Sequence, residues 1–144
     1  EGGTVDCVKV TDFGQAKGTE YGGTYTAGAA RMFPIRWMSP EVIRNQQLDR
    51  TADVWSFGVV IYEVLSGGAK PYYEVMTNEA VLKGVADGTL RLEARDTVVA
   101  DSEHLWLVAE RCFAPAGERP SFDKVVEMLP GEAMGGTEDH QASE

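Results

Sequence analysis

The sequence predicts a mostly α-helical protein with about five helices, one short strand and one long loop. The stretch 53–65, DVWSFGVVIYEVL, is apolar on nearly every side of a helical wheel, which is typical of a helix inside a protein core. Helix start and stop signals bracket three later segments, and two of these carry an apolar stripe at helical spacing. Residues 7–11 alone alternate between apolar and polar side chains, as a strand does.

Composition limits the class of protein. The chain has 144 residues, 43% of them hydrophobic and 25% charged, as expected for one globular domain or part of one. The formal charge of −10 argues against a nucleic-acid partner and against an anionic membrane surface. No apolar run is long enough to span a bilayer. Two cysteines without metal-ligand spacing indicate a reducing compartment.

The first third of the chain contains the strand, the long loop and a short helix. Residues 7–11 form the predicted strand, and residues 18–30, rich in Gly, Thr and Ala, form the loop. A short helix is expected over 41–44, with Pro40 at or before its first position. A lone strand cannot satisfy its own backbone, so its partner is expected in residues 1–6 or outside this chain. The domain therefore looks truncated.

Each later helix has a predicted start and end. Asp53 stands at the entrance of the apolar helix, where its carboxylate suits the free N–H groups and the helix dipole, and Gly67-Gly68 end this helix. Thr77 is the predicted cap of a helix over 78–87, which Gly88 ends. Ser102 or Asp101 is the predicted cap of a helix that runs to residue 113, and Ser121 is the predicted cap of the last helix. Residues 130–144 are acidic and Gly-rich, and are expected to form a disordered tail.

Four motifs follow one another in a recognisable order. Asp12-Phe13-Gly14 follows the predicted strand, Ser39-Pro40-Glu41 precedes the short helix, Asp53–Gly58 (DVWSFG) opens the apolar helix, and Arg119–Phe122 (RPSF) opens the last helix. In this order and spacing they resemble the later half of a protein kinase domain. The resemblance implies a partial domain over 1–129, consisting of the helical C-terminal lobe of the kinase α+β fold. The N-terminal lobe and the catalytic loop are absent.

The resemblance also implies a role for several charged residues. Asp12 would hold Mg²⁺ against the phosphates of ATP, with Phe13 packing beneath it and Gly14 permitting a turn. Glu41 and Arg119 would form a structural ion pair. Asp53 would hydrogen-bond the backbone of the catalytic loop, so that the apolar helix anchors that loop.

The stretch 33–38, FPIRWM, resembles the substrate-docking segment of tyrosine kinases. The resemblance assigns substrate docking to Pro34, Ile35, Arg36 and Trp37, which form a proline-stiffened apolar shelf that suits a long phenol side chain. Within it, Pro34 would make a platform beside an extended substrate and Arg36 would help set the loop. Tyr21 and Tyr25 fall where activation loops are phosphorylated. A phosphate there would order the loop by pairing with arginines such as Arg31 or Arg36. The alternative is that both tyrosines are only exposed aromatic residues, and Tyr72 and Tyr73 are expected to be packing residues.

No H-R-D occurs in the 144 residues, so none of the catalytic-loop residues lies in this chain, and the fragment alone is expected to be inactive. The first hypothesis is a parent tyrosine kinase that uses ATP and Mg²⁺ and acts on protein tyrosine. The others are a pseudokinase that serves as a binding scaffold, and a tyrosine-kinase-like serine/threonine kinase. The expected location is the cytoplasm or the cytoplasmic face of a membrane receptor, with membrane association only through segments upstream.

Overall fold

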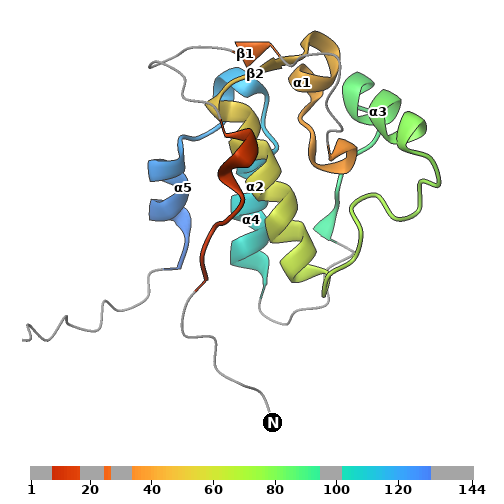
Figure 1. Ribbon diagram of the computed structural model, residues 1–144. Coiled ribbons are helices and arrows are strands. Elements are labelled where there is room, and N and C mark those ends of the chain that lie inside the picture. Colours follow the sequence, from red (N-terminus) through yellow and green to blue (C-terminus); the bar gives the residue numbers. More distant parts are fainter. Residues whose placement is uncertain (1–7, 17–24, 27–33, 95–101, 131–144) are drawn as a thin grey trace, which may run out of the picture.

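The computed structural model describes residues 8–16, 25–26, 34–94 and 102–130. Within these ranges the chain is mostly helical, as predicted (Figure 1). The α-helices are α1 (Pro40–Asn45), α2 (Arg50–Leu65), α3 (Asn78–Asp87), α4 (Glu103–Cys112) and α5 (Phe122–Met128). Single 3-10 turns cover Phe13–Gln15, Ile35–Trp37 and Ala116–Glu118. Two short strands, β1 (Tyr25–Thr26) and β2 (Gln47–Leu48), pair antiparallel with Tyr25 opposite Leu48.

The helix α2 lies at the centre of the molecule and packs mainly against α4 (Figure 1). Gly58 allows this approach, because a Cβ atom at this position would lie 2.7 Å from Cβ of Cys112 on α4. The rings of Trp55 and Phe113 meet edge to face beside this contact, with centroids 5.1 Å apart. Cys112 is buried, and burial raises the pKa of its thiol to about 11, so this residue is a small apolar member of the core.

The start of α2 differs from the prediction. The helix begins at Arg50, and its N-cap is Asp49, whose Oδ1 accepts hydrogen bonds from the backbone N–H groups of Thr51 (2.8 Å) and Ala52 (3.2 Å). Asp53 lies inside the first turn and is not the cap. The apolar run begins at Asp53, which favours this residue as the cap, but the polar turn before it is also helical. At the other end Gly67 and Gly68, with φ of 70° and 88°, end the helix as predicted.

The predicted ends of the other helices agree closely with the structure. Thr77 caps α3 by accepting a hydrogen bond from the N–H of Ala80, and Gly88 ends that helix with φ of 80°. Ser121 caps α5 by accepting from the N–H of Lys124. Pro40 is the first residue of α1. Ser102 precedes α4 without a side-chain cap bond, and Asp101 lies outside the described residues.

The expectation that α2 is buried on all sides is wrong. Asp53, Val60 and Val64 lie along one open face of the helix, and the two valines are 44% and 62% exposed. On α5, Val126 is 66% exposed. A helical wheel shows which side chains are apolar but does not show which of them have a neighbour to pack against.

The predicted strand over 7–11 is also wrong. Residues 8–11 have no regular structure, and Val8 and Val10 are 86% and 81% exposed. No strand in the described part of the chain pairs with them, and a strand without a partner leaves its N–H and C=O groups unpaired. Cys7 and the proposed tail after Pro130 lie outside the described residues. No helix in the described ranges is long and apolar enough to cross a membrane.

Substitution of the two carboxylates near the start of α2 tests the assignment of the cap. Asp49→Ala is expected to lower the free energy of unfolding by about 1 kcal/mol, because two backbone N–H groups lose their acceptor. Asp53→Ala is the matched control and should change it by less than about 0.5 kcal/mol. Urea denaturation followed by circular dichroism measures both. A larger loss for Asp53→Ala would show that Asp53 is the cap.

Candidate functional site

The first part of the candidate site is the turn that begins at Asp12. Asp12 has φ of 64° and ψ of 63°, a left-handed conformation that aspartate tolerates better than most residues. The following turn closes with a 2.9 Å hydrogen bond from the N–H of Ala16 to the carbonyl of Phe13. Asp12 is exposed. Its carboxylate forms no hydrogen bond or ion pair with any residue of the described ranges, so it is open to solvent.

An open single carboxylate fits a Mg²⁺ ion that arrives with a nucleotide. Mg²⁺ keeps several waters and is usually held by one or two carboxylates together with substrate phosphates. Over the described ranges no group of three or more His, Cys, Asp or Glu side chains could hold a metal by itself. Asp12 therefore offers one ligand, and the nucleotide and other groups would supply the rest. Phe13 does not pack beneath it but is 68% exposed, because no described residue covers this segment.

The second part is the turn over Ile35–Trp37, which Arg36 joins to the connection between α2 and α3. The Arg36 side chain is buried, and each of its three guanidinium nitrogens donates. Nη1 donates to the carbonyls of Pro71 and Tyr72 and Nη2 to the carbonyl of Val75, all at 2.8 Å. Nε donates to Oδ1 of Asn78 at 3.1 Å. Four acceptors around one guanidinium hold the turn against this connection and the start of α3.

These contacts separate the four predicted docking residues into two kinds. Pro34 is exposed and Ile35 is half-buried, so a substrate can reach them. Arg36 is enclosed by four acceptors and positions the turn. Two hydrogen bonds fix Trp37 to α2. Its Nε1 donates to Oε2 of Glu63 at 2.9 Å, and its carbonyl accepts from Oγ of Ser56 at 3.0 Å.

The predicted phosphorylation sites are described only in part. Tyr21 and Arg31 lie outside the described residues. Tyr25 lies in β1 opposite Leu48, and only its backbone is described. Of the two tyrosines expected to be packing residues, Tyr72 is buried, but Tyr73 is 52% exposed, so this expectation holds for only one of them.

The predicted pair of Glu41 and Arg119 is present and is bidentate. Nη1 of Arg119 donates to Oε1 of Glu41 at 2.7 Å and Nη2 donates to Oε2 at 3.2 Å. Nη1 also donates to the carbonyl of Thr51 at 2.7 Å, and Nε donates to the carbonyl of Ala114 at 3.0 Å. The guanidinium lies 5.2 Å from the centre of the Trp55 ring. One side chain thus joins α1, the start of α2 and the connection between α4 and α5.

The pair also shifts the ionisation of Glu41. Partial burial alone raises the pKa of this carboxyl, but the hydrogen bonds and the charge of Arg119 outweigh burial, and the net pKa is lowered. Asp53 shows the opposite behaviour, since partial desolvation and the negative charge of Asp49 raise the pKa of its carboxyl. The carboxylate of Asp53 has no hydrogen-bond partner within the described chain, and it stands on the open face of α2.

Sequence reasoning missed the acceptors that surround Arg36. The turn over 71–74 places Tyr72 in a left-handed conformation, with φ of 54°, while its ring is buried. Three carbonyls of this connection then converge on a guanidinium 35 to 39 residues earlier in the chain. No local pattern indicates contacts between backbone carbonyls and a distant side chain.

Comparisons with known proteins agree with these features. The family model described as protein tyrosine and serine/threonine kinase matches residues 3–129. The insulin-like receptor of Caenorhabditis elegans is 36% identical over 131 residues, which are 89% of this chain and 7% of the receptor. Vascular endothelial growth factor receptor 3 of Mus musculus is 34% identical over 91% of this chain and 9% of its own length. Ephrin type-A receptor 1 of Homo sapiens is 40% identical over 83% of this chain and 12% of its own length.

The role of Arg36 can be tested by a charge-conserving substitution. Arg36→Lys keeps the positive charge but cannot reach four acceptors in different directions, so buried carbonyls lose their partners. We expect the free energy of unfolding to fall by roughly 2–3 kcal/mol, and proteolysis of the 71–78 connection to become faster. Arg111→Lys, at an exposed position on α4, is the control and should change neither quantity. Equal stability of the two variants would contradict this role.

Removal of the negative charge of Glu41 tests the buried pair. Glu41→Gln should lower the free energy of unfolding by about 3 kcal/mol, because Arg119 is left buried with weaker acceptors. The folded-state pKa of Glu41 lies below its unfolded value near 4.5. The stabilisation is therefore complete above that value and is lost as pH falls through the folded pKa.

Chemical denaturation between pH 7 and pH 3 measures this loss, and the Glu41→Gln variant should lack that part of the acid dependence. Glu127→Gln is the matched control, because Glu127 pairs with Lys124 at 2.6 Å while both side chains are more than 60% exposed. Such an exposed pair contributes less than about 1 kcal/mol. The assignment is overturned if the two variants lose equal stability.

Proposed function

Since this chain belongs to the protein tyrosine and serine/threonine kinase family, we propose that its parent protein transfers the γ-phosphoryl group of ATP to tyrosine side chains of proteins. The chain spans about a tenth of the length of these relatives. The activity therefore belongs to the whole protein. Each of the three relatives is named as a receptor, and we place this domain on the cytoplasmic side of a membrane receptor.

The observation that carries tyrosine specificity is the rigid shelf made by Pro34 and Ile35. Proline fixes its own backbone φ, and the turn that follows is held by the four hydrogen bonds of Arg36. An exposed apolar edge on a fixed turn can support the long ring of tyrosine, whereas the short side chains of serine and threonine would not reach it. Positioning of this kind is a large part of catalysis in phosphoryl transfer.

Asp12 is the residue of this chain that would hold the metal–nucleotide complex. When bound, Mg²⁺ would neutralise negative charge on the phosphates. The contribution of Asp12 is an exposed carboxylate on a turn closed by the hydrogen bond between Ala16 and Phe13. The base that accepts the proton of the substrate hydroxyl is not assigned to this chain, because the sequence contains no H-R-D.

Tyr21 and Tyr25 are proposed as regulatory phosphorylation sites. A phosphate there adds negative charge and strong acceptors, which order a loop when arginines are near. Arg36 cannot serve as that partner while its guanidinium is enclosed by four acceptors. Arg31 is then the remaining candidate of the two that the sequence indicated.

The proposal is tested in the full-length parent protein with matched peptides that carry Tyr, Ser or Thr at one position. We expect phosphorylation of the Tyr peptide alone, and a decrease of at least about a hundredfold in kcat for Asp12→Asn, because a charged ligand is lost. Asp123→Asn, on the exposed side of α5, is the control and should retain activity. The purified 1–144 chain should transfer no phosphate.

Two outcomes contradict the proposal. Phosphorylation of the Ser peptide in preference to the Tyr peptide would identify a serine/threonine kinase. Absence of transfer by a folded full-length protein that still binds a partner would identify a pseudokinase scaffold.

A further inference from the structure

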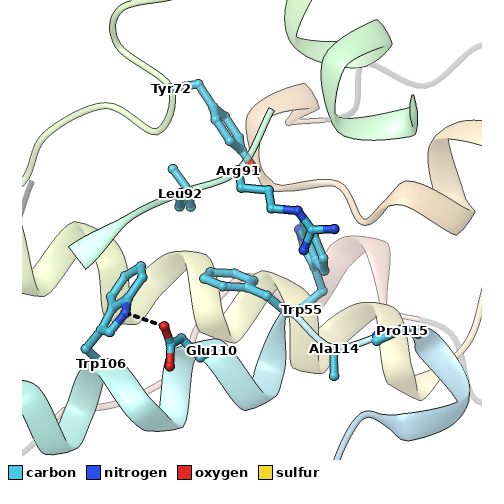
Figure 2. A pocket seen from close by; sticks show the side chains of 9 residues that line it. Trp55, Tyr72, Arg91, Leu92, Trp106, Glu110, Ala114 and Pro115 are labelled. Carbon is cyan, nitrogen blue, oxygen red and sulfur yellow. Dashed lines mark hydrogen bonds between the residues drawn. The ribbon is translucent and has the colours of Figure 1, made fainter. Parts of the chain in front are cut away.

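A cavity lies between α2, α4 and the segment that follows α3. Its volume is about 320 Å³, at the lower end of the range for small-molecule sites. Four aromatic side chains, Trp55, Tyr72, Trp106 and Phe113, line it together with Arg91, Leu92, Glu110, Ala114 and Pro115. In Figure 2, Arg91 extends toward Trp55 on the side of the cavity opposite Trp106 and Glu110. Aromatic walls of this kind suit a flat ring.

Trp55, which lines this cavity, carries a buried N–H group without a partner in the described part of the chain. The residue is 8% exposed. The other two tryptophans each donate to a carboxylate at 2.9 Å, Trp37 to Glu63 and Trp106 to Glu110. A buried N–H without an acceptor costs free energy. A ligand with an acceptor atom beside Trp55 would remove this cost, provided that the surrounding side chains move enough for the acceptor to reach the N–H.

The charge around Trp55 is positive although the chain as a whole is acidic. A second cavity, of about 310 Å³, shares Trp55 and Arg91 with the first and is also lined by Arg44, Arg119 and Glu41. Arg119 is paired with Glu41, and Arg44 donates to the carbonyl of Ala86. Arg91 is exposed, and no hydrogen bond or ion pair joins it to the rest of the described chain. Its guanidinium can therefore receive an anion.

We propose that this cavity binds a small aromatic carboxylate. The flat ring would lie among Tyr72, Trp106 and Phe113. The carboxylate would lie at the Trp55 side, where the guanidinium of Arg91 and the indole N–H of Trp55 supply two kinds of donor. Guanidinium and carboxylate match in shape and charge. A cationic ring is disfavoured, because three arginines and only two glutamates line the two cavities.

The test is isothermal titration of the full 144-residue chain with naphthalene-2-carboxylate. Its neutral amide, naphthalene-2-carboxamide, is the matched ligand, and naphthalen-2-ylmethylamine is the cationic one. We expect saturable one-to-one binding of the carboxylate, with the amide about tenfold weaker and the amine weaker still, because a charge-assisted hydrogen bond is lost. Arg91→Ala should weaken binding of the carboxylate about tenfold and leave binding of the amide unchanged.

Arg111→Ala is the control variant, since Arg111 is exposed on α4 and does not line either cavity. Its affinity should equal that of the unchanged chain. Trp55→Phe keeps an aromatic wall without the N–H and should weaken the carboxylate and the amide alike. Because this substitution also removes core volume, circular dichroism must first show that the variant is folded, and Arg91→Ala remains decisive if it is not.

Three results would overturn the proposal. They are the absence of saturable binding up to millimolar carboxylate, equal effects of Arg91→Ala and Arg111→Ala, and preference for the amine. None of them bears on kinase activity of the parent protein, which the peptide assay measures separately.

Discussion

The fold depends on the burial of one positive charge, the guanidinium of Arg119. Its side chain is 1% exposed, and a buried cation is stable only when it is fully hydrogen-bonded and paired. Glu41 of α1, the carbonyl of Thr51 at the start of α2 and the carbonyl of Ala114 after α4 meet this requirement together, and the face of Trp55 covers the charge. The same contacts set the relative positions of three helices, so a shift of any one of them would leave the charge with fewer partners.

Arg36 is a second buried cation, and its need for hydrogen-bond acceptors fixes the turn over Ile35–Trp37. Its acceptors are three backbone carbonyls and one side-chain amide, which are neutral, so the bonds position a segment without a countercharge. The connection after α2 must bend sharply to present these carbonyls, and Tyr72 adopts its left-handed conformation there. Burial raises the pKa of the Tyr72 hydroxyl, which keeps this residue neutral inside the core. The hydrogen bonds of the buried Arg36 thus hold rigid the turn that follows the exposed Pro34.

The open face of α2 has a different physical character. Val60 and Val64 present apolar surface there, and the segment with Val8, Val10 and Phe13 presents more. Exposed apolar surface of this extent is typical of an interface. The carboxylate of Asp53 stands on the same face of α2 with a raised pKa. We propose that the catalytic loop of the parent kinase lies against this face, where the apolar side chains of α2 are not fully covered.

The sequence by itself determined the family, the helical class and most helix ends, because caps such as Thr77 and Ser121 and stops such as Gly88 act within one turn of the chain. It also indicated the pair of Glu41 and Arg119 through the motifs. The cap of α2 by Asp49 is also a local contact, with the N–H groups of Thr51 and Ala52, although the apolar run favoured Asp53. Only the tertiary structure decided that Arg36 is enclosed and that the segment from Val8 to Thr11 is not a strand. These outcomes depend on contacts between backbone groups and side chains that are far apart in the sequence, and local sequence patterns do not indicate such contacts. The cavity beside Trp55 is of the same kind, since its walls come from four separate parts of the chain.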